Sequence, residues 1–230
     1  MSGFFVSGTD TEVGKTFVSA ALLHASASYG FSTLGLKPVA AGCDRTEHGL
    51  RNEDALALMA ASTEKIDYHK VNPIPLEPAI APHIAAAEAG TKLSASALAA
   101  HCREILDPEH FTLVEGAGGW LVPLNLDETL ADFAVHLQLP VILVVGLKLG
   151  CINHALLSAQ SIGSSGLQLA AWVANAGPTS MQRQMENVAT LEALLSAPCL
   201  GQIPWLGVSA NPAQAAPMLD FHKLLSRVET

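Results

Sequence analysis

Residues Gly8–Thr16 read GTDTEVGKT, and they stand between a short apolar run and a segment with helical spacing. Backbone N–H groups of a glycine-rich loop in this context point at phosphate oxygens, and the helix start adds a partial positive charge. Gly14 allows the backbone to approach the phosphates closely, Lys15 has the reach to contact the β- and γ-phosphates, and Thr16 is placed to ligate Mg²⁺. The stretch therefore predicts a loop that binds the triphosphate of ATP.

The spacing of this loop differs from the usual phosphate-binding pattern. Gly8 and Gly14 are separated by five residues instead of four, and Thr9 occupies the place of the usual first glycine. The alternative interpretation is a Gly/Thr-rich turn followed by a helix with a lysine in its first turn. The order strand, loop, GKT, helix is the context that phosphate binding requires, and it favours that interpretation.

Apolar runs and helical segments alternate along the whole chain. The runs expected to form strands are Phe4–Ser7, Thr33–Lys37, Thr112–Glu115, Val141–Val145, Ala170–Asn175 and, more weakly, Cys199–Ile203. The segments expected to form helices are Lys15–Ser28, Glu53–Ala61, Ser94–Leu106, Leu130–Leu137, Asn153–Ile162 and Met185–Leu195. This order predicts an α/β fold of the P-loop NTPase type, with a mostly parallel sheet flanked by helices on both faces. Without repeats or a separating linker, residues 1–230 are expected to form a single domain.

Composition excludes several classes of function. The 230 residues are 50% hydrophobic and 14% charged, with 12 Lys+Arg against 21 Asp+Glu, and the net charge of −9 disfavours nucleic acid and anionic membrane as partners. The most apolar stretch, Leu139–Leu147, is interrupted by Pro140 and Gly146 and is far shorter than a membrane helix. The start, MSGFFVSGTD, does not resemble a signal peptide. The four cysteines form no CxxC pair, which predicts free thiols and a cytoplasmic location.

Charged residues stand at strand ends and at a helix start. Glu115 ends the strand in TLVEG, at the sheet edge where ligands bind in open α/β folds, and its carboxylate suits Mg²⁺. Asp54 is by itself more typical of an acid in the first turn of a helix, and Glu53 competes for the same role. Lys37 closes a strand before a proline and has either a role in phosphoryl transfer or that of a solvated lysine.

Two further turns and a Pro-rich stretch are candidates for ligand contacts. Glu115–Gly119 allows close backbone contact or simply a tight turn. Lys148–Asn153 precedes a helix whose free N–H groups suit a carboxylate, and Cys151 within it fits a small buried residue better than a nucleophile. Asn72–Pro82 contains four prolines, which exclude a helix and a central strand, and it is either an ordered loop that shapes a site or a simple connector.

Taken together, several motifs resemble one family, the dethiobiotin synthetases. These motifs are GTDTEVGKT, LKPVAAG, RNEDALAL, VEGAGGW, PVILVVGLKLGCINHA, WVAN and GQIPWL, which occur in the family's order between about residues 3 and 206. The extra residue of the phosphate loop is normal in this family. The resemblance implies a single α/β domain that acts as a homodimer. It also implies ATP- and Mg²⁺-dependent ring closure of 7,8-diaminononanoate with CO₂ or bicarbonate, through a carbamate and a carbamic-phosphoric anhydride, to dethiobiotin, ADP and phosphate.

The resemblance also implies roles for individual residues. The implied catalytic lysines are Lys15 and Lys37, and the implied metal ligands are Thr16, Asp54 and Glu115. The implied nucleotide contacts are Glu12, Val13, Gly14, Lys15, Thr16, Phe17, Asp54, Glu115, Gly116, Ala117, Gly118, Asn175, Pro204, Trp205 and Leu206. The implied substrate contacts are Thr11, Lys37, Ala41, Gly150, Cys151, Ile152 and Asn153, and the Gly150–Asn153 helix start is expected to reach the substrate carboxylate across the dimer interface.

Three positions depart from the family's pattern. Ala41 stands where the family often has a serine that bonds the substrate amine or carbamate, so a hydroxyl contact is missing or left to water. The surroundings of Asn187 lack the tyrosine expected near the substrate carboxylate. The segment after Trp205, LGVSANPAQ, gives no acidic nucleotide contact. These departures bear on substrate affinity more than on the chemistry.

Two other functions fit part of the pattern. A related ATP-dependent amidoligase acts on a larger carboxylate, but that family usually carries an added glutaminase domain, for which this chain is too short. A partitioning-type nucleotide switch dimerises on ATP, but such switches usually place an extra lysine early in the loop, and Gly8–Glu12 contains none. ADP release that needs the diamine and bicarbonate together separates the synthetase from both alternatives.

Overall fold

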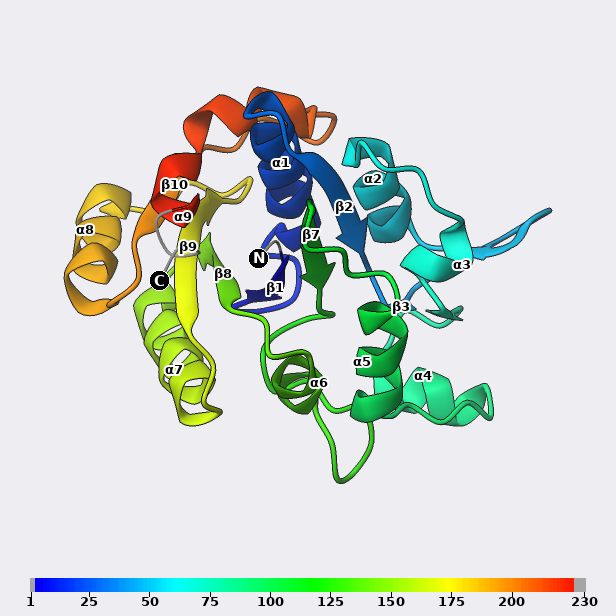
Figure 1. The fold of residues 1–230 in the computed structure, drawn as a ribbon. Coiled ribbons are helices and arrows are strands. Elements are labelled where there is room, and N and C mark those ends of the chain that lie inside the picture. The colour runs from blue at the N-terminus through cyan, green and yellow to red at the C-terminus, as the bar shows by residue number, and fades with distance from the viewer. Residues whose placement is uncertain (1–2, 226–230) are drawn as a thin grey trace.

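Six strands form one parallel sheet in the order β10-β9-β8-β1-β7-β2, seen in the computed structural model, which describes residues 3–225 (Figure 1). Their bounds are β1 Gly3–Gly8, β2 Ser32–Leu36, β7 His110–Glu115, β8 Val141–Leu147, β9 Leu169–Ala176 and β10 Cys199–Ile203. Each of the six apolar runs identified in the sequence forms one of these strands. The predicted fold class is confirmed.

The predicted helices form within a few residues of their expected ends. They are α1 Lys15–Ser28, α2 Glu53–Ala61, α5 Ala95–Arg103, α6 Leu130–Leu137, α7 Cys151–Ser164 and α8 Gln184–Leu194. Local signals account for several of the ends. Asn52 accepts a hydrogen bond from the N–H of Ala55 and so caps α2, while Thr129 and Asp132 form a capping box at the start of α6. The helix boundaries therefore follow largely from the local sequence.

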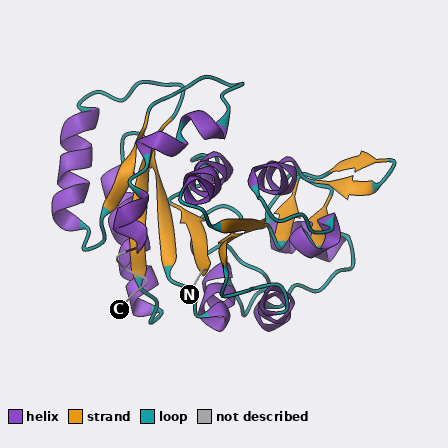
Figure 2. Ribbon diagram, turned by 45° about the horizontal axis from the view of Figure 1, so that its top comes forward, coloured by secondary structure: helices purple, strands orange, loops and turns teal. Residues whose placement is uncertain are grey.

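Helices cover both faces of the central sheet (Figure 2). Side chains along each strand alternate between these two faces. On β1, Phe4 and Val6 pack with residues of α1, whereas Phe5 points to the other face, where its ring lies 5.7 Å from that of Phe133 on α6. The face with α1 also carries the short C-terminal helix α9, Phe221–Leu225, and the opposite face carries α5, α6, α7 and α8. Helices on both faces of the sheet are thus confirmed.

Smaller elements surround the carboxyl end of β2, and the sequence did not predict them. They are β3 Val39–Ala41, β4 Asp44–Thr46, β5 Gly49–Arg51, α3 Tyr68–Val71, β6 Ile74–Leu76 and α4 Pro82–Glu88, and two 3₁₀ turns, Pro212–Gln214 and Ala216–Met218, follow β10. The β4–β5 hairpin projects from the body of the molecule (Figure 1). Within the Pro-rich stretch, β6 pairs only with β3, and α4 begins at the last proline. The absence of a central strand there agrees with the sequence interpretation.

Two expectations about the chain concern membranes and thiols. Between residues 3 and 225, no helix has the length and apolar character needed to cross a bilayer. The cysteines Cys43, Cys102, Cys151 and Cys199 are free thiols, and the first three are buried. Cys151 is 1% exposed, which agrees with its interpretation as a small buried residue.

Candidate functional site

The carboxyl ends of all six parallel strands meet at one edge of the sheet, and each end leads into a segment of the candidate site. Ligands bind at this edge in open α/β folds. The contributions are the Gly8–Thr16 loop after β1, Lys37 after β2, Glu115 at the end of β7, Gly146–Lys148 at the end of β8, Asn175 on β9 and Pro204–Leu206 after β10. One edge of the fold therefore gathers residues that are far apart in the sequence.

The phosphate loop is held open by its own backbone and by β8. Gly14, directly before α1, has a φ of 81°, and Glu12 has a φ of 59°. Both values lie in the left-handed region, which glycine adopts more readily than other residues. Thr9, in the place of the usual first glycine, donates its N–H to the carbonyl of Val144, and its hydroxyl accepts from the N–H of Gly146 at 3.3 Å. Thr9 thus ties the loop to β8.

The middle of the loop is fixed from two neighbouring strands. The Asn175 side chain donates to the carbonyl of Val13 at 2.9 Å. Gly146 has no side chain where Val13 packs, and a Cβ there would lie 2.6 Å from a Val13 methyl carbon. These contacts fix the backbone of the loop directly before α1.

A buried lysine lies between two carboxylates beside the loop. The Nζ of Lys37 lies 2.7 Å from Oε1 of Glu115 and 3.0 Å from Oδ2 of Asp54, and it also donates to the carbonyl of Gly116 at 3.2 Å. Burial alone would lower the pKa of Lys37, but the two carboxylates outweigh it and hold the pKa above its usual value. Burial raises the pKa of Asp54, but Lys37 and Thr16 reverse this and hold it below its usual value. Lys37 and Asp54 are therefore both charged at neutral pH.

Glu115 is held by hydroxyl groups from the first turns of α1. Oε1 accepts a hydrogen bond from Thr16, and Oε2 accepts one from Ser19, both at 2.7 Å. Ser19 is completely buried, and Glu115 is 1% exposed. Thr16 and Ser19 are three residues apart and so share one face of the helix. The spacing shows in the sequence that Ser19 shares a helix face with Thr16. The sequence does not show that Ser19 binds Glu115, which lies on a distant strand.

Lys15 begins α1 and lies close to the same cluster. Burial, reinforced by the positive charge of Lys37, lowers the pKa of Lys15 to about 8. Its Nζ lies 3.5 Å from the carbonyl oxygen of Asp10, inside the loop. A largely buried ammonium in this position is suited to an anionic group with several oxygens.

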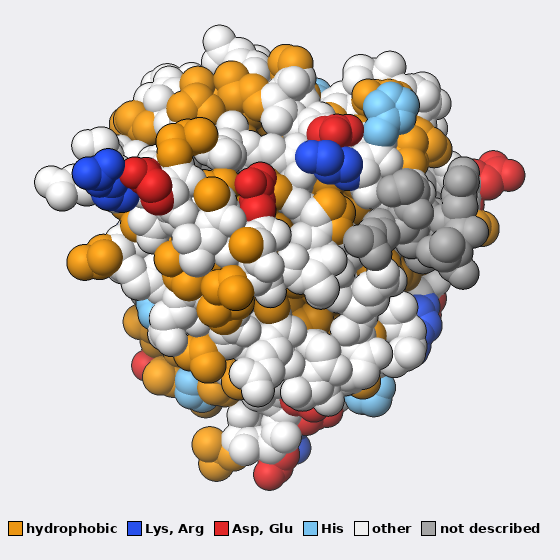
Figure 3. Space-filling view, turned by 90° about the vertical axis from the view of Figure 1, so that its left-hand side faces the viewer, with side chains coloured by type: hydrophobic (Ala, Val, Ile, Leu, Met, Phe, Trp, Pro, Cys, Tyr) orange, Lys and Arg blue, Asp and Glu red, His pale blue; other side chains and the backbone are white. Residues whose placement is uncertain are grey.

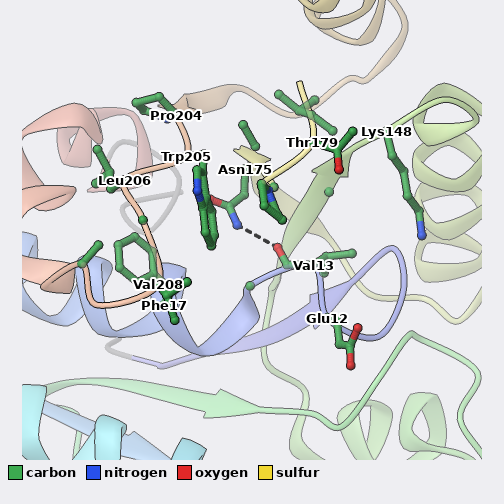
Figure 4. A pocket seen from close by; sticks show the side chains of 18 of the residues that line it. Glu12, Val13, Phe17, Lys148, Asn175, Thr179, Pro204, Trp205, Leu206 and Val208 are labelled. Carbon is green, nitrogen blue, oxygen red and sulfur yellow. Dashed lines mark hydrogen bonds between the residues drawn. The ribbon is translucent and has the colours of Figure 1, made fainter. Parts of the chain in front are cut away.

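Two cavities open at this edge and meet at the phosphate loop. The first cavity, about 510 Å³, extends from Gly14 past Asn175 to Trp205 and Val208. Figure 4 shows Trp205 beside Asn175, with Phe17 and Leu206 on one side and Lys148 on the far side. The second cavity, about 750 Å³, is lined by the charged side chains of Lys15, Lys37 and Asp54, and its outer wall is apolar. Thr11, Glu12 and Gly14 line both cavities.

Comparison with known sequences identifies the family to which this chain belongs. The chain is 56% identical over 222 residues to the ATP-dependent dethiobiotin synthetase BioD of Cellvibrio japonicus, covering 94% of this chain and 97% of the relative. It is 56% identical over 225 residues to the protein of the same name from Pseudomonas paraeruginosa, covering 97% and 98%. A family model described as an AAA domain matches residues 2–213. The chain belongs to the dethiobiotin synthetase family.

Solved structures agree with the fold of this dethiobiotin synthetase family member. The septum site-determining protein MinD of Pyrococcus horikoshii, solved with Mg-ADP, matches with a TM-score of 0.58 at 14% identity, covering 99% of this chain and 96% of that one. The signal recognition particle receptor FtsY of Elizabethkingia anophelis matches with a TM-score of 0.52 at 15% identity, covering 100% and 65%. At such low identity these likenesses show the P-loop fold and nothing about substrates.

Most of the residues implied by the dethiobiotin synthetase resemblance come together in the structure. The first cavity contains Thr11, Glu12, Val13, Gly14, Phe17, Asn175, Pro204, Trp205 and Leu206. The second contains Thr11, Glu12, Gly14, Lys15, Thr16, Lys37, Ala41, Asp54, Ala117 and Gly118. Glu115 and Gly116 line neither cavity, but both accept a hydrogen bond from the Nζ of Lys37. The individual roles of these residues remain predictions.

One implied group of residues lies elsewhere. Gly150, Cys151, Ile152 and Asn153 line neither of these two cavities. They lie at the start of α7, where Gly150 and Asn153 are exposed, Cys151 is buried, and the preceding Leu149 is 94% exposed. The sequence analysis assigned them to the site of a second subunit, and this assignment stays a prediction.

Several site residues were missing from the sequence analysis. Lys148 lines the first cavity and forms an ion pair with Asp10 of the loop at 2.5 Å. Gly207 and Val208 line the same cavity, in the segment that departs from the family. In the second cavity, Ile80 and Val122 supply part of the apolar wall. Lys148 was quoted within a motif, whereas the others are small or apolar residues that carry no chemical signal in the sequence.

The oxygen donors beside Lys37 fit magnesium. Thr16, Glu115 and Asp54 supply one hydroxyl and two carboxylates. Lys37 forms ion pairs with both carboxylates, and the Thr16 hydroxyl donates to Glu115, so the three groups lie close together. Hard oxygen ligands of this kind suit Mg²⁺, which usually takes only one or two carboxylates and completes its shell with phosphates and water. In keeping with this, residues 3–225 contain no group of three or more His, Cys, Asp or Glu side chains that could hold a metal alone.

Proposed function

We propose that this chain is an ATP- and Mg²⁺-dependent ligase that carboxylates 7,8-diaminononanoate with CO₂ and closes the ureido ring of dethiobiotin, releasing ADP and phosphate. The observation that carries the proposal is the junction of the two cavities. The first cavity, which suits a nucleotide, and the second cavity share Thr11, Glu12 and Gly14. Lys15, whose pKa is lowered, and Lys37, whose pKa is raised, both line the second cavity. Transfer of a γ-phosphoryl group between two bound molecules needs this arrangement.

The dimensions and lining of the cavities support a division of labour between them. The first cavity suits the nucleoside, because Trp205 and Phe17 offer ring surfaces and Asn175 offers an amide to a base edge. The triphosphate then follows the loop toward Lys15 and Thr16 and brings the γ-phosphate to the second cavity. There, Ala79–Pro82, Val122 and Pro123 form an apolar wall that suits the hydrocarbon chain of the diamine acid. Two expectations from the sequence are consistent with this division. They are the nucleotide contact at Asn175 and the interpretation of Asn72–Pro82 as a loop that shapes a site.

The reaction balances without any further reactant. One amine of the substrate adds to CO₂ and loses a proton, which gives a carbamate. A carbamate oxygen attacks the γ-phosphorus of ATP, the bond to the bridging oxygen breaks, and ADP leaves with that electron pair. The second amine then attacks the carbonyl carbon of the mixed anhydride, phosphate leaves, and the loss of one proton completes the ring.

The chain's own residues would bind and stabilise the reacting groups. Lys15 and the N–H groups before α1 hold the β- and γ-phosphate oxygens. Lys37, fixed by Glu115 and Asp54, presents its charge where negative charge develops between carbamate and phosphate. Magnesium held by Thr16, Asp54 and Glu115 would supply further neutralisation of the phosphates. The Ala41 methyl faces the second cavity in place of the family's hydroxyl, so a water molecule is left to contact the amine or carbamate.

We also propose that the enzyme is a cytoplasmic homodimer and that residues 1–230 form one domain. The start of α7 supports the dimer because Gly150 and Asn153 are exposed there, and a helix start suits a carboxylate bound in the partner, although the N–H of Cys151 already donates to the carbonyl of Lys148. Exposed apolar side chains also lie on the outer helices, including Leu157 on α7 and Leu194 on α8, and hydrophobic groups are spread over the side with α8 (Figure 3). The free thiols support the cytoplasmic location.

The proposal predicts that ADP release depends on both small substrates. With ATP and Mg²⁺ present, steady ADP release is expected only when 7,8-diaminononanoate and bicarbonate are added together. Leaving out either one should reduce the rate to the background, because no acceptor for the phosphoryl group then forms. A coupled ADP assay measures this, with mass spectrometry of the product as the control for ring closure. Equal ADP release without the diamine would overturn the assignment.

A further inference from the structure

A second polar network lies behind the charged cluster and holds the backbone of Lys37. The side-chain amide of Asn72 donates to the carbonyl of Lys37 at 2.6 Å, and the N–H of Lys37 donates to the carbonyl of Val71 at 3.0 Å. Asn72 is 1% exposed. Both backbone groups of Lys37 are thus bound to one short segment at the end of α3, which lies outside the central sheet.

The hydroxyl of Tyr68 joins this segment to α2. It accepts a hydrogen bond from the N–H of Asn52 at 2.7 Å and donates one to Oδ1 of Asn72 at 3.0 Å. Asn52 caps α2, and its side chain also donates to the carbonyl of Ala41 at 3.3 Å. In a capping box, the side chain of the third helical residue accepts a hydrogen bond from the N–H of the cap residue. Here the hydroxyl of Tyr68, from another helix, accepts that hydrogen bond instead.

The network therefore connects the two elements that carry Lys37 and Asp54. Asp54 lies in the first turn of α2, two residues after Asn52, and its Oδ2 is 3.0 Å from the Nζ of Lys37. The network is linked to Lys37 and Asp54 through backbone groups of Lys37 and Asn52, and its own side chains do not line the second cavity. Arg51 stabilises it from outside, since its guanidinium carbon lies 4.2 Å from the centroid of the Tyr68 ring.

From this geometry we infer that Asn52, Tyr68 and Asn72 are positioning residues that set the separation of Lys37 from Asp54 in the reacting complex. The inference rests on the proposed function, because it concerns the rate of phosphoryl transfer. Positioning is demanding, since a displacement of about 1 Å far from the chemistry can cost about 10²-fold in rate. Buried polar groups that are fully paired rigidify their surroundings, whereas a single missing partner leaves several of them unsatisfied.

The test is Tyr68→Phe, which removes only the hydroxyl and keeps the ring under Arg51. The N–H of Asn52 and Oδ1 of Asn72 then lose their shared partner. We expect kcat to fall about tenfold or more. The affinity for the nucleotide measured without Mg²⁺, followed through tryptophan fluorescence, should stay within about twofold, because the network does not contact the phosphate loop. Tyr29→Phe is the matched control: this second tyrosine packs on Phe221 at the far end of α1 and should leave all these values unchanged.

A double variant separates positioning from simple loss of stability. If Tyr68 and Asn72 act through one network, Tyr68→Phe combined with Asn72→Ala should lower kcat little more than Asn72→Ala alone. Independent losses would instead multiply. A crystal structure of Tyr68→Phe should show the Lys37 Nζ displaced from Asp54. If that variant folds poorly, Arg51→Met tests the same network from outside and should lower kcat in the same direction by about two- to threefold.

The outcomes distinguish the two proposals. A wild-type chain whose ADP release does not need the diamine overturns the proposed function, and the inference with it. A wild type that needs both substrates, together with a Tyr68→Phe variant of unchanged kcat and unchanged Lys37 position, overturns the inference alone. Equal losses in kcat and in nucleotide affinity also contradict it, because they indicate a general disturbance of the site.

Discussion

Lys37→Gln is expected to lower kcat by about 10²–10³-fold while ATP still binds. Lys37 is 3% exposed and lies between Glu115 and Asp54, so its charge is fixed in place before the substrates arrive. Glutamine retains a hydrogen-bond donor for Glu115 but carries no charge. Interactions that matter mainly in the transition state affect kcat more than binding, and the charge of Lys37 is placed for that state.

Steady-state kinetics and a nucleotide titration measure the two parts of this prediction separately. Lys92→Gln is the matched control, since Lys92 is an exposed lysine after α4 that lines neither cavity. The unliganded Lys37→Gln protein should also melt at a lower temperature, because Glu115 remains buried without its charged partner. Turnover within about threefold of the wild type would show that the charge of Lys37 is not needed.

Lys15→Met should weaken the binding of Mg²⁺-ATP by about 10- to 100-fold, the value expected for the loss of a charge-assisted hydrogen bond to phosphate. Methionine preserves the length of the side chain and its packing at the start of α1. The fold should therefore survive, and thermal melting without nucleotide checks this. Calorimetric titration with a non-hydrolysable ATP analogue measures the affinity.

The pH dependence of binding gives this prediction a second, independent part. In the unliganded protein the pKa of Lys15 is about 8, so Lys15 is protonated below that pH and increasingly neutral above it. Phosphate oxygens favour the protonated form, so binding above about pH 8 must take up a proton, and the affinity should fall as the pH rises. The neighbouring Lys37 and Asp54 stay charged in this range, because their pKa values are shifted away from it.

The Lys15→Met variant is also the control for titration of the nucleotide itself. Proton uptake at pH 8.5, measured in buffers of different ionisation enthalpy, should be present in the wild type and lost in the variant. Equal proton uptake in both proteins would assign the titration to another group. An unchanged affinity in the variant would remove Lys15 from the phosphate site.

Local patterns in the sequence were sufficient for the central sheet and the phosphate loop. Five of the apolar runs are almost completely buried in the parallel sheet, so their composition alone marks them as strands, whereas Cys199–Ile203, at one edge of the sheet, is only partly buried. The helices α1, α2 and α6 begin and end where the pattern predicted. Because parallel strands end at one edge, Lys37, Glu115 and Asn175 could be placed near the loop before any contact was known.

The residues that the sequence analysis missed depend on contacts between distant segments. Ser19 is a serine in the middle of a helix until Glu115, from a distant strand, is placed beside it. Tyr68 and Asn72 lie in a stretch of short, irregular elements whose hydrogen bonds go to α2 and to the end of β2. The sequence analysis interpreted Asn72–Pro82 as either a loop that shapes a site or a simple connector, but it could not show that Ala79 and Ala81 line the second cavity.

The most direct test is a crystal structure with a non-hydrolysable ATP analogue and Mg²⁺. We expect the β- and γ-phosphates on the N–H groups of Gly14, Lys15 and Thr16, and the base in the first cavity against Asn175. The metal should lie about 2.0–2.1 Å from the Thr16 hydroxyl and from carboxylate oxygens of Glu115 or Asp54. A nucleotide bound away from residues 8–16, or a loop that stays closed by its own side chains at saturating nucleotide, would contradict the assignment of the site.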